Sequence, residues 1–444
     1  MNKVVTRIAP SPTGRFHIGT ARTALFNYLF ARHMGGSFLI RVEDTDRERS
    51  KPEFEKDILD GLAGLGLVAD ETVRQSERVD RHTELLKELV GRDLAYVSHE
   101  ESKTEAGKTV EVVRLRNPGR EVTFHDEVRG DITFDTTELG DFVIARSLTD
   151  PLYHFAVVAD DMDMGVTHVI RGEDHISNTP RQILIQEAIG APRPVYAHLP
   201  LILDEKRAKL SKRSGATSVQ DYLDEGILPE ALVNYLALLG WNPGDTREYF
   251  TLQELVDAFS LEGIQKSGAA WDREKLLSVN QHWMRELTTD AFITRGNLTA
   301  PDEKLLIESV PLLKERARTF SEARELLSGE LSCLFTKPEL HRELLVAKEP
   351  TERPGMTETA LESLQEPIKS LPEGISAEVV KESLMPFADA EEAKGKGGRG
   401  AVLWPLRYAL SGRERSPDPF TLIAILGKEE TLSRLEKAVA ILEG

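Results

Sequence analysis

The sequence predicts an α/β fold with a parallel, doubly wound sheet that is interrupted once and followed by an all-α region. Three observations lead to this prediction. Strand-like and helix-like apolar segments alternate over residues 1–90. The charged, turn-rich segment that follows lacks this alternation, which returns after residue 148. From about residue 287 onward, apolar residues recur with helical spacing. We therefore expect a Rossmann-type domain with an α+β insertion and an all-helical C-terminal region.

The first half of the Rossmann-type domain is expected at residues 1–90. "VVTRIAP" is typical of a short buried strand ended by proline, and "SFLIRVED" is typical of the next strand. Between them, Ala21, Leu25 and Leu29 give residues 20–34 a helical stripe that stops at two glycines. A strand, a helix and a second strand in this order indicate a parallel sheet.

The other domain boundaries follow from changes in the pattern. Residues 91–148 are expected to form the inserted module, and residues 149–217 the second half of the Rossmann-type domain. A helical connector is expected at 218–286 and the all-helical region at 287–444. A chain of 444 residues has room for these parts, because single cores rarely grow beyond roughly 250–300 residues.

Composition limits the classes of function. Hydrophobic residues make up 40% of the chain and charged residues 29%, as in globular proteins that dissolve in water. Because no apolar run approaches the roughly 20 residues that span a bilayer, we expect a cytoplasmic protein that does not enter a membrane. Cys333 is the only cysteine, which excludes an intramolecular disulfide and a cysteine-rich zinc site. The net charge of −18 argues against non-specific nucleic-acid binding but not against a local basic surface.

Two short loops carry residues that suit a nucleotide site. "HIGT", at residues 17–20, joins a strand to a helix, where backbone N–H groups bind anions and Gly19 permits close approach. "KLSKR" puts Lys209 and Lys212 on a loop, where ammonium groups can neutralise a phosphate. Taken singly, these segments are better explained as a plain strand–helix turn and a solvated basic loop.

Together, the two loops resemble the paired signatures of class I aminoacyl-tRNA synthetases. Longer segments narrow the resemblance to bacterial-type glutamyl-tRNA synthetases, and the resemblance extends over almost the whole chain. These segments include "RIAPSPTGRFHIGTARTALFNYLFAR", "RVEDTDRERS", "VIRGEDHISNTPRQIL", "WDREKLLSVNQHW" and "LGKEETLSRL".

The resemblance implies an enzyme, a glutamate–tRNA ligase, that activates L-glutamate with ATP and transfers it to the terminal adenosine of a tRNA. The implied catalytic residues, which also bind ATP, are His17, Lys209 and Lys212. The other implied ATP-binding residues are Gly19, Asp174 and Ile202. Mg²⁺ is expected to accompany ATP without metal ligands from the protein. Zinc, which many relatives hold through cysteines after "AY", is not expected, since "YVSH" follows here.

The resemblance also places a glutamate pocket at Arg7, Ser11, Glu43, Tyr153 and Arg171. These residue types suit the substrate, because guanidinium groups bind carboxylates and a carboxylate binds an ammonium group. Which arginine meets the side-chain carboxylate of the substrate stays open. In the alternative interpretation, the two arginines only pair with Glu43 or Asp174 at the strand ends.

The implied partner is tRNA(Glu), with the inserted module at its acceptor end and the helical region at its anticodon. Whether tRNA(Gln) is charged as well stays open, because Ser332 aligns with an arginine of some relatives that charge one tRNA. We expect a monomer. The rival functions are a glutaminyl enzyme, a shorter relative that glutamylates a tRNA base, a nucleotidyltransferase that does not use tRNA, and an inactive RNA-binding paralogue. "APSPTG", the long helical tail and the intact site residues disfavour these rivals.

Overall fold

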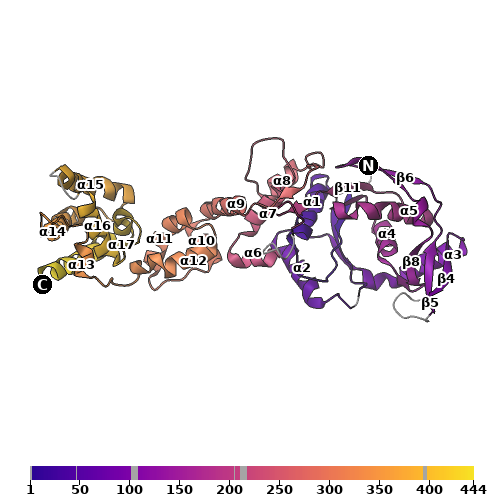
Figure 1. Ribbon diagram of the computed structural model, residues 1–444, viewed down its shortest axis with the longest axis horizontal. Helices are drawn as coiled ribbons and strands as arrows, with labels where there is room; N and C mark the ends of the chain where they lie inside the picture. The colour runs from indigo at the N-terminus through magenta and orange to yellow at the C-terminus, as the bar shows by residue number, and fades with distance from the viewer. Residues whose placement is uncertain (1–2, 47, 102–108, 205, 211–217, 394–397) are drawn as a thin grey trace. The chain divides into compact units, whose positions relative to one another are not determined.

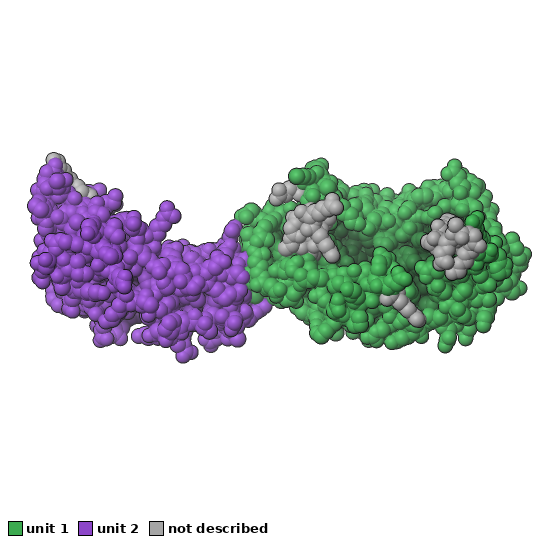
Figure 2. Space-filling model, turned by 60° about the horizontal axis from the view of Figure 1, so that its bottom comes forward, with its two compact units in different colours: residues 1–280 green, residues 281–444 purple. Residues whose placement is uncertain are grey.

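A computed structural model describes most of the chain and divides it into two compact units, Met1–Asn280 and Gln281–Gly444 (Figure 2). The described residues are 3–46, 48–101, 109–204, 206–210, 218–393 and 398–444. None of the helices within these ranges is long and apolar enough to cross a membrane. The division falls inside helix α9 (Arg273–Glu286), a few residues before the start of the helical region that the sequence predicts.

The first unit is built on a parallel sheet (Figure 1). Three of its strands pair in the order β1-β2-β3, and two more pair as β10-β11. These strands are β1 (Val5–Ile8), β2 (Ser37–Val42), β3 (Glu71–Arg74), β10 (His168–Gly172) and β11 (Val195–Leu199). The N–H of Thr167 donates to the carbonyl of Val5 (3.0 Å), which puts β10 beside β1. The resulting order, 3-2-1-10-11, is that of a Rossmann-type sheet.

Helices cover both faces of this sheet, because side chains alternate along a strand. They are α1 (Ile18–His33), α2 (Pro52–Gly64), η1 (Gln75–Arg78), α3 (Val79–Gly91), α4 (Tyr153–Asp163), η3 (Glu173–Asn178) and α5 (Thr179–Ile189). The ring centroids of Phe30, on α1, and His168 are 4.9 Å apart. The next residue, Val169, instead joins a buried core with Phe155 of α4 and Ile183 of α5. The doubly wound α/β sheet that the sequence predicts is confirmed.

The segment between the two halves of the sheet contains two sets of strands. One set is an antiparallel sheet of β4 (Ala95–Glu101), β5 (Thr109–Leu115), β8 (Phe142–Ser147) and β9 (Asp150–Pro151), and η2 (Thr137–Leu139) lies before β8. The other set is a hairpin of β6 (Glu121–Asp126) and β7 (Gly130–Asp135). This hairpin extends the parallel sheet, because Asp126 pairs with Tyr196 of β11.

The rest of the first unit consists of short elements after the parallel sheet. They are β12 (Ile202–Leu203), α6 (Val219–Glu225), α7 (Pro229–Leu238), α8 (Leu252–Ala258) and β13 (Ala269–Ala270). Strand β12 pairs in parallel with β13, which ties the segment after β11 to the helical connector.

Among the described residues of the second unit, the regular elements are all helices, as the sequence predicts. They are α10 (Thr289–Gly296), α11 (Glu303–Arg316), α12 (Phe320–Ser328), η5 (Glu330–Leu334), α13 (Arg342–Leu345), α14 (Met356–Lys369), α15 (Ala377–Ala393), α16 (Gly400–Ser411) and α17 (Pro419–Glu443). The buried Arg434 of α17 donates to the carbonyls of Cys333 (2.7 Å) and Leu410 (2.6 Å). One guanidinium group therefore holds η5, α16 and α17 together.

Candidate functional site

A cavity of about 500 Å³ opens at the carboxyl ends of β1, β2, β10 and β11. This is the edge at which open α/β sheets bind their ligands. The residues of the predicted site that line the cavity are Arg7, Ser11, His17, Gly19, Glu43, Tyr153, Arg171, Asp174, Ile202 and Lys209. Lys212 lies outside the described residues. The fold thus gathers on one wall side chains that are widely separated in the sequence.

The strands and helix starts explain why these residues meet. Arg7 and Arg171 lie near the ends of β1 and β10, and Glu43 directly follows β2. Tyr153 is the first residue of α4, and His17 precedes the first residue of α1. Parallel strands end at one edge of a sheet, and helices that run back antiparallel to the strands start there, so residues at these positions converge.

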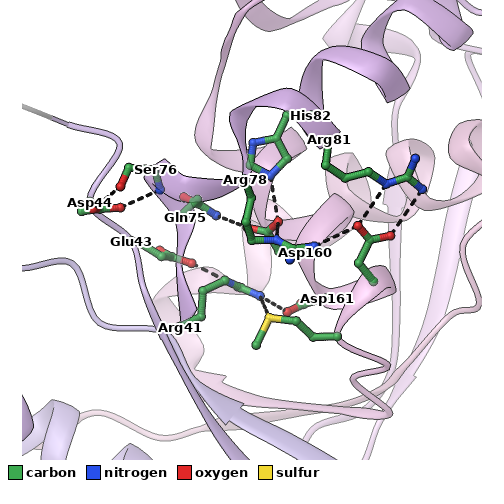
Figure 3. A network of polar contacts seen from close by, with 12 residues as sticks. Arg41, Glu43, Asp44, Gln75, Ser76, Arg78, Arg81, His82, Asp160 and Asp161 are labelled. Carbon is green, nitrogen blue, oxygen red and sulfur yellow. Dashed lines mark hydrogen bonds and ion pairs between the residues drawn. The ribbon is translucent and has the colours of Figure 1, made fainter. Parts of the chain in front are cut away.

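Three guanidinium groups and two carboxylates form what we call the arginine cluster: Arg7, Arg41, Arg171, Glu43 and Asp161. Asp161 accepts from Nε (3.1 Å) and Nη2 (3.4 Å) of Arg7 and from Nη1 of Arg41 (2.5 Å). Nη2 of Arg41 then donates to Oε1 of Glu43 (3.1 Å; Figure 3). One aspartate therefore orients both an arginine that lines the cavity and the arginine that holds Glu43.

The neighbouring Asp160 supports a separate network. Its carboxylate accepts from Gln75 (2.9 Å) and Arg78 (2.6 Å) and lies 2.8 Å from Nε2 of His82 (Figure 3). Asp160 is fully buried, and these contacts tie α4 to η1 and α3. Adjacent carboxylates of α4 thus serve different parts of the first unit, and only that of Asp161 contacts the arginine cluster.

Burial dominates the protonation equilibria of the cavity wall. Arg41 and Arg7 hold the pKa of Asp161 below its ordinary value, although burial by itself would raise it. Burial, and then Glu43, raise the pKa of the Tyr153 phenol to about 12. Burial, and then Arg171, lower the pKa of the His175 imidazole to about 4. Tyr153 and His175 are therefore uncharged near neutral pH, and the arginine cluster sets the charge of this wall.

Arg171 is held by two further buried side chains. Its Nε donates to Nε2 of His198 (3.2 Å), and its Nη2 donates to the hydroxyl of Thr179 (2.9 Å). Nδ1 of His198 in turn lies 2.6 Å from a carboxylate oxygen of Asp126. Arg171 is 6% exposed and the other three are fully buried, so this chain of contacts is shielded from solvent.

A second group of charges lines the cavity, and we call it the lysine pair: Lys209 and Asp174. Their Nζ and Oδ2 atoms are 2.8 Å apart, and the two side chains are 61% and 44% exposed. Nearby, Nδ1 of His17 accepts from the N–H of Gly19 (3.0 Å) and caps α1. A neutral His17 ring therefore carries its proton on Nε2 and is a donor there.

Gly19 and the segment from Pro200 to Ile202 form the remaining wall. Among the described residues, a Cβ on Gly19 would meet only the ring of His17, at 3.4 Å, so packing does not require a glycine. Arg22 of α1 donates to the carbonyl of Pro200, and the carbonyl of Ile202 accepts from the N–H of Leu210 (2.9 Å). These contacts fix the backbone of the 200–202 segment.

The described residues that line the cavity do not form a metal cage. Glu43 and Asp174, the carboxylates that line it, are engaged by Arg41 and Lys209. Within the described ranges, the group of three acidic residues near enough to hold one ion lies in the second unit, at Glu358, Glu362 and Glu443. A divalent ion in the cavity would take its ligands from a bound phosphate and water, which suits Mg²⁺.

Sequence reasoning missed the residues that hold the predicted ones in place: Arg22, Arg41, Asp126, Asp161 and His198. The available signal was a polar residue within an apolar segment, such as Arg41 in "SFLIRV" and His198 in "VYAHL". The alternative pairing is wrong for the described residues, because Arg7 pairs with Asp161, and Arg171 contacts His198 and Thr179.

Comparisons with known proteins match both units. Residues 3–105 and 98–278 match the family described as tRNA synthetases class I (E and Q), catalytic domain. Residues 274–439 match the family described as anticodon binding domain.

Full-length relatives are similar in sequence and structure. The chain is 39% identical to the glutamate–tRNA ligase of Syntrophobacter fumaroxidans, over 100% of this chain and 99% of that one. It is 40% identical to glutamate–tRNA ligase 1 of Alkalilimnicola ehrlichii, over 99% and 98% of the two chains. A crystal structure of a glutamate tRNA ligase from Elizabethkingia meningosepticum, in complex with its amino acid, has a TM-score of 0.85 and 32% identity, over 99% and 100%.

Proposed function

Because this chain belongs to the class I tRNA synthetase family, among its glutamate–tRNA ligases, we propose that it joins L-glutamate to tRNA(Glu) with ATP as the energy source. The observation that carries the proposal is the composition of one cavity wall. Arg7, Glu43 and Arg171 of the buried arginine cluster line the same cavity as the exposed lysine pair and His17. Binding an acidic amino acid next to a nucleoside triphosphate needs fixed guanidinium groups beside exposed ammonium groups.

The arginine cluster is complementary to glutamate in charge and in donor type. Its three guanidinium groups exceed its two carboxylates by one formal positive charge. Glutamate at neutral pH carries one net negative charge, from two carboxylates and one ammonium group. Arg7 and Arg171 are the proposed partners of the carboxylates, and Glu43 is that of the ammonium group. Ser11 and Tyr153 add hydroxyl groups to the same wall.

Activation needs charge stabilisation rather than a covalent enzyme intermediate. A carboxylate oxygen of glutamate attacks the α-phosphorus of ATP, an O–P bond forms, the bond to the β-phosphate oxygen breaks, and pyrophosphate leaves. Lys209, Lys212 and the Nε2–H of His17 are the proposed donors to the phosphate oxygens. Asp174 and Ile202 are proposed to contact the ribose and the adenine. Mg²⁺ would supply further phosphate neutralisation when bound.

Transfer completes the reaction on tRNA. A ribose hydroxyl of the 3′-terminal adenosine attacks the activated carbonyl carbon, its proton leaves, and AMP departs. The match of residues 274–439 to an anticodon binding domain supports tRNA as the acceptor. We also propose that the protein acts in the cytoplasm as a monomer.

The surroundings of Ser332 bear on the open question of whether tRNA(Gln) is charged as well as tRNA(Glu). Ser332 accepts a hydrogen bond from Nη2 of Arg413 (2.7 Å), and Nη1 of Arg413 donates to the carbonyl of Gly329 (2.5 Å). A guanidinium group therefore lies beside the position where some relatives carry arginine. On this ground we favour tRNA(Glu) as the preferred substrate.

Aminoacylation of purified tRNA(Glu) and tRNA(Gln) with radiolabelled glutamate tests the proposal. We expect ATP-dependent charging of tRNA(Glu), and no charging with glutamine in place of glutamate. Charging of neither tRNA would overturn the proposal. Equal charging of both would overturn only the preference for tRNA(Glu), and R413A then tests whether Arg413 affects the choice at all.

A further inference from the structure

We propose that His198 and Asp126 are positioning residues that fix the Arg171 guanidinium group for binding a substrate carboxylate. The inference rests on the proposed function, because it assigns Arg171 to glutamate. Neither His198 nor Asp126 lines the cavity, so both act through Arg171 rather than on the substrate.

The contacts form a continuous buried chain from a strand end to the cavity. Oδ2 of Asp126 lies 2.6 Å from Nδ1 of His198, and Nε2 of His198 lies 3.2 Å from Nε of Arg171. Asp126 and His198 are fully buried, and Arg171 lines the cavity at 6% exposure. A charged side chain so far from solvent is held in place only by such partners.

The direction of the hydrogen bonds determines the protonation of His198. The Arg171 guanidinium group can only donate, so Nε2 of His198 accepts with its lone pair. The Thr179 hydroxyl also lies 3.2 Å from Nε2, and it can donate to the same nitrogen. A neutral imidazole that accepts at Nε2 carries its proton at Nδ1 and donates it there. The carboxylate of Asp126 is the acceptor that Nδ1–H needs. Burial lowers the pKa of His198 and outweighs the contact with Asp126, which raises it, and Arg171 lowers the pKa further; the net direction agrees with a neutral ring.

Asp126 is itself fixed in position by the hairpin that extends the parallel sheet. Its Oδ1 accepts from the N–H groups of Val128 (3.1 Å) and Arg129 (2.8 Å), and its Oδ2 accepts from the N–H of His198 (3.1 Å). The same carboxylate therefore closes the turn between β6 and β7 and selects the His198 tautomer. The β6–β7 hairpin lies in the segment that separates the two halves of the parallel sheet, so this segment reaches the cavity through Asp126.

These bonds leave the outer edge of Arg171 available to a ligand. Nε is directed to His198 and Nη2 to Thr179, whereas Nη1 has no partner among the described residues. With Nε anchored, rotation of the guanidinium plane is restricted, which lowers the entropy cost of binding a carboxylate. If Nε2 of His198 carried the proton instead, two donors would face each other, and Arg171 would be displaced from this orientation.

Three substitutions separate this positioning role from a general role in stability. D126N keeps Oδ1 for the N–H groups of Val128 and Arg129 but offers Nδ1 of His198 an amide donor, which favours the wrong tautomer. H198N keeps a donor near Asp126 and removes the acceptor for Arg171. H198Q removes the donor and places an amide oxygen near the position of Nε2, so it is the conservative variant for the contact to Arg171.

We expect KM for glutamate in tRNA(Glu) aminoacylation to rise about ten- to hundredfold in D126N and H198N, because a hydrogen bond to a charged group is lost. H198Q should recover most of this loss. KM for ATP should change less than about twofold in all three, since Arg171 is not assigned to ATP. Nitrogen-15 NMR of histidine-labelled enzyme should show His198 protonated at Nδ1 in the wild type and at Nε2 in D126N.

The wild-type assay keeps the two proposals apart. If the wild type charges tRNA(Glu) but D126N and H198N keep its KM for glutamate, the positioning role is wrong and the proposed function stands. The same conclusion follows if KM for glutamate and for ATP rise together, or if the ring is protonated at Nε2 in the wild type. If the wild type does not charge tRNA(Glu), the proposed function fails regardless of the NMR result.

Discussion

The arginine cluster, through Arg7, Glu43 and Arg171, lines the same cavity as the lysine pair, but the charges of the two groups are held in different ways. In the arginine cluster, the side chains of Arg7 and Asp161 are 4% and 9% exposed. In the lysine pair, those of Lys209 and Asp174 are 61% and 44% exposed. Asp161 alone accepts three hydrogen bonds in the first set, whereas a single contact between exposed side chains holds the second.

This difference matches the demands of two steps. Selecting one amino acid requires charges whose positions are set before the substrate arrives, and buried, multiply bonded groups provide that. Stabilising charge that develops on a phosphate requires a side chain that can leave its resting partner. A solvent-exposed ion pair contributes only about 0–1 kcal/mol and is easily exchanged. We infer that burial divides the cavity into a fixed part and an adaptable part.

The largest expected effect comes from breaking the fixed part at Asp161. D161N leaves the buried guanidinium groups of Arg7 and Arg41 without their shared carboxylate. We expect a loss of about 3–5 kcal/mol in the free energy of unfolding, the usual result of removing one partner from a buried ion pair. KM for glutamate should also rise about a hundredfold or more, since the carboxylate that orients both Arg7 and Arg41 is lost. Denaturant unfolding and steady-state aminoacylation measure the two quantities.

The adjacent Asp160 provides a matched control. It is equally buried and bonded to Gln75, Arg78 and His82, but it does not contact Arg7, Arg41 or Glu43. D160N should therefore lower the free energy of unfolding to a similar extent and leave KM for glutamate near the wild-type value. If both variants raise KM equally, general destabilisation explains the result and Asp161 has no special role at the cavity.

The adaptable part should give the opposite pattern in K209A. Because its side chain is exposed, removing the ammonium group should change the free energy of unfolding by less than about 1 kcal/mol. The rate of ATP–pyrophosphate exchange, measured with tRNA(Glu) present, should fall about 10²- to 10³-fold, as when one stabilising donor is removed from a transition state. K56A is the matched control, because Lys56 forms an exposed pair with Asp60 on α2. An exchange rate in K209A equal to that of K56A would remove Lys209 from the chemistry.

The sequence predicted the parallel sheet because apolar periodicity reports which faces are buried. Alternation of strands and helices was enough to place Arg7 and Arg171 at one edge of the sheet, and their contact with a common cavity follows from that topology. The roles of these residues came from the resemblance to a family rather than from periodicity, and they stay predictions.

The partners of the buried charges could not be predicted from the sequence. Asp160 and Asp161 are consecutive residues of one helix, yet they serve different networks, because successive positions on a helix point about 100° apart. Asp126 and His198 meet only because a hairpin adds to the edge of β11. Local composition does not determine which face of a helix meets a given neighbour, nor the order of strands in a sheet. The partners of these residues could therefore be identified only from the three-dimensional structure.

The smallest expected effect concerns His154. It is a half-buried titratable group with no ion-pair partner among the described residues, and so adds a third case to the comparison of the arginine cluster with the lysine pair. Nδ1 of His154 is buried and has no hydrogen-bond partner among the described residues, and burial, followed by Arg181, lowers the pKa of the imidazole to about 4. Between pH 6.5 and 4 the unfolded chain therefore binds a proton that the folded chain does not, so stability falls as the pH falls through this window. H154F should reduce the loss in the free energy of unfolding from pH 7 to pH 5 by no more than about 1 kcal/mol, after discounting for partial exposure.

His125 has the opposite effect on the pH dependence of stability, because its contact with Asp131 raises its pKa. H125Q should therefore lose at least as much free energy of unfolding as the wild type when the pH falls from 7 to 5. Urea unfolding at the two pH values measures both variants, and parallel losses in H154F and the wild type would contradict the assignment.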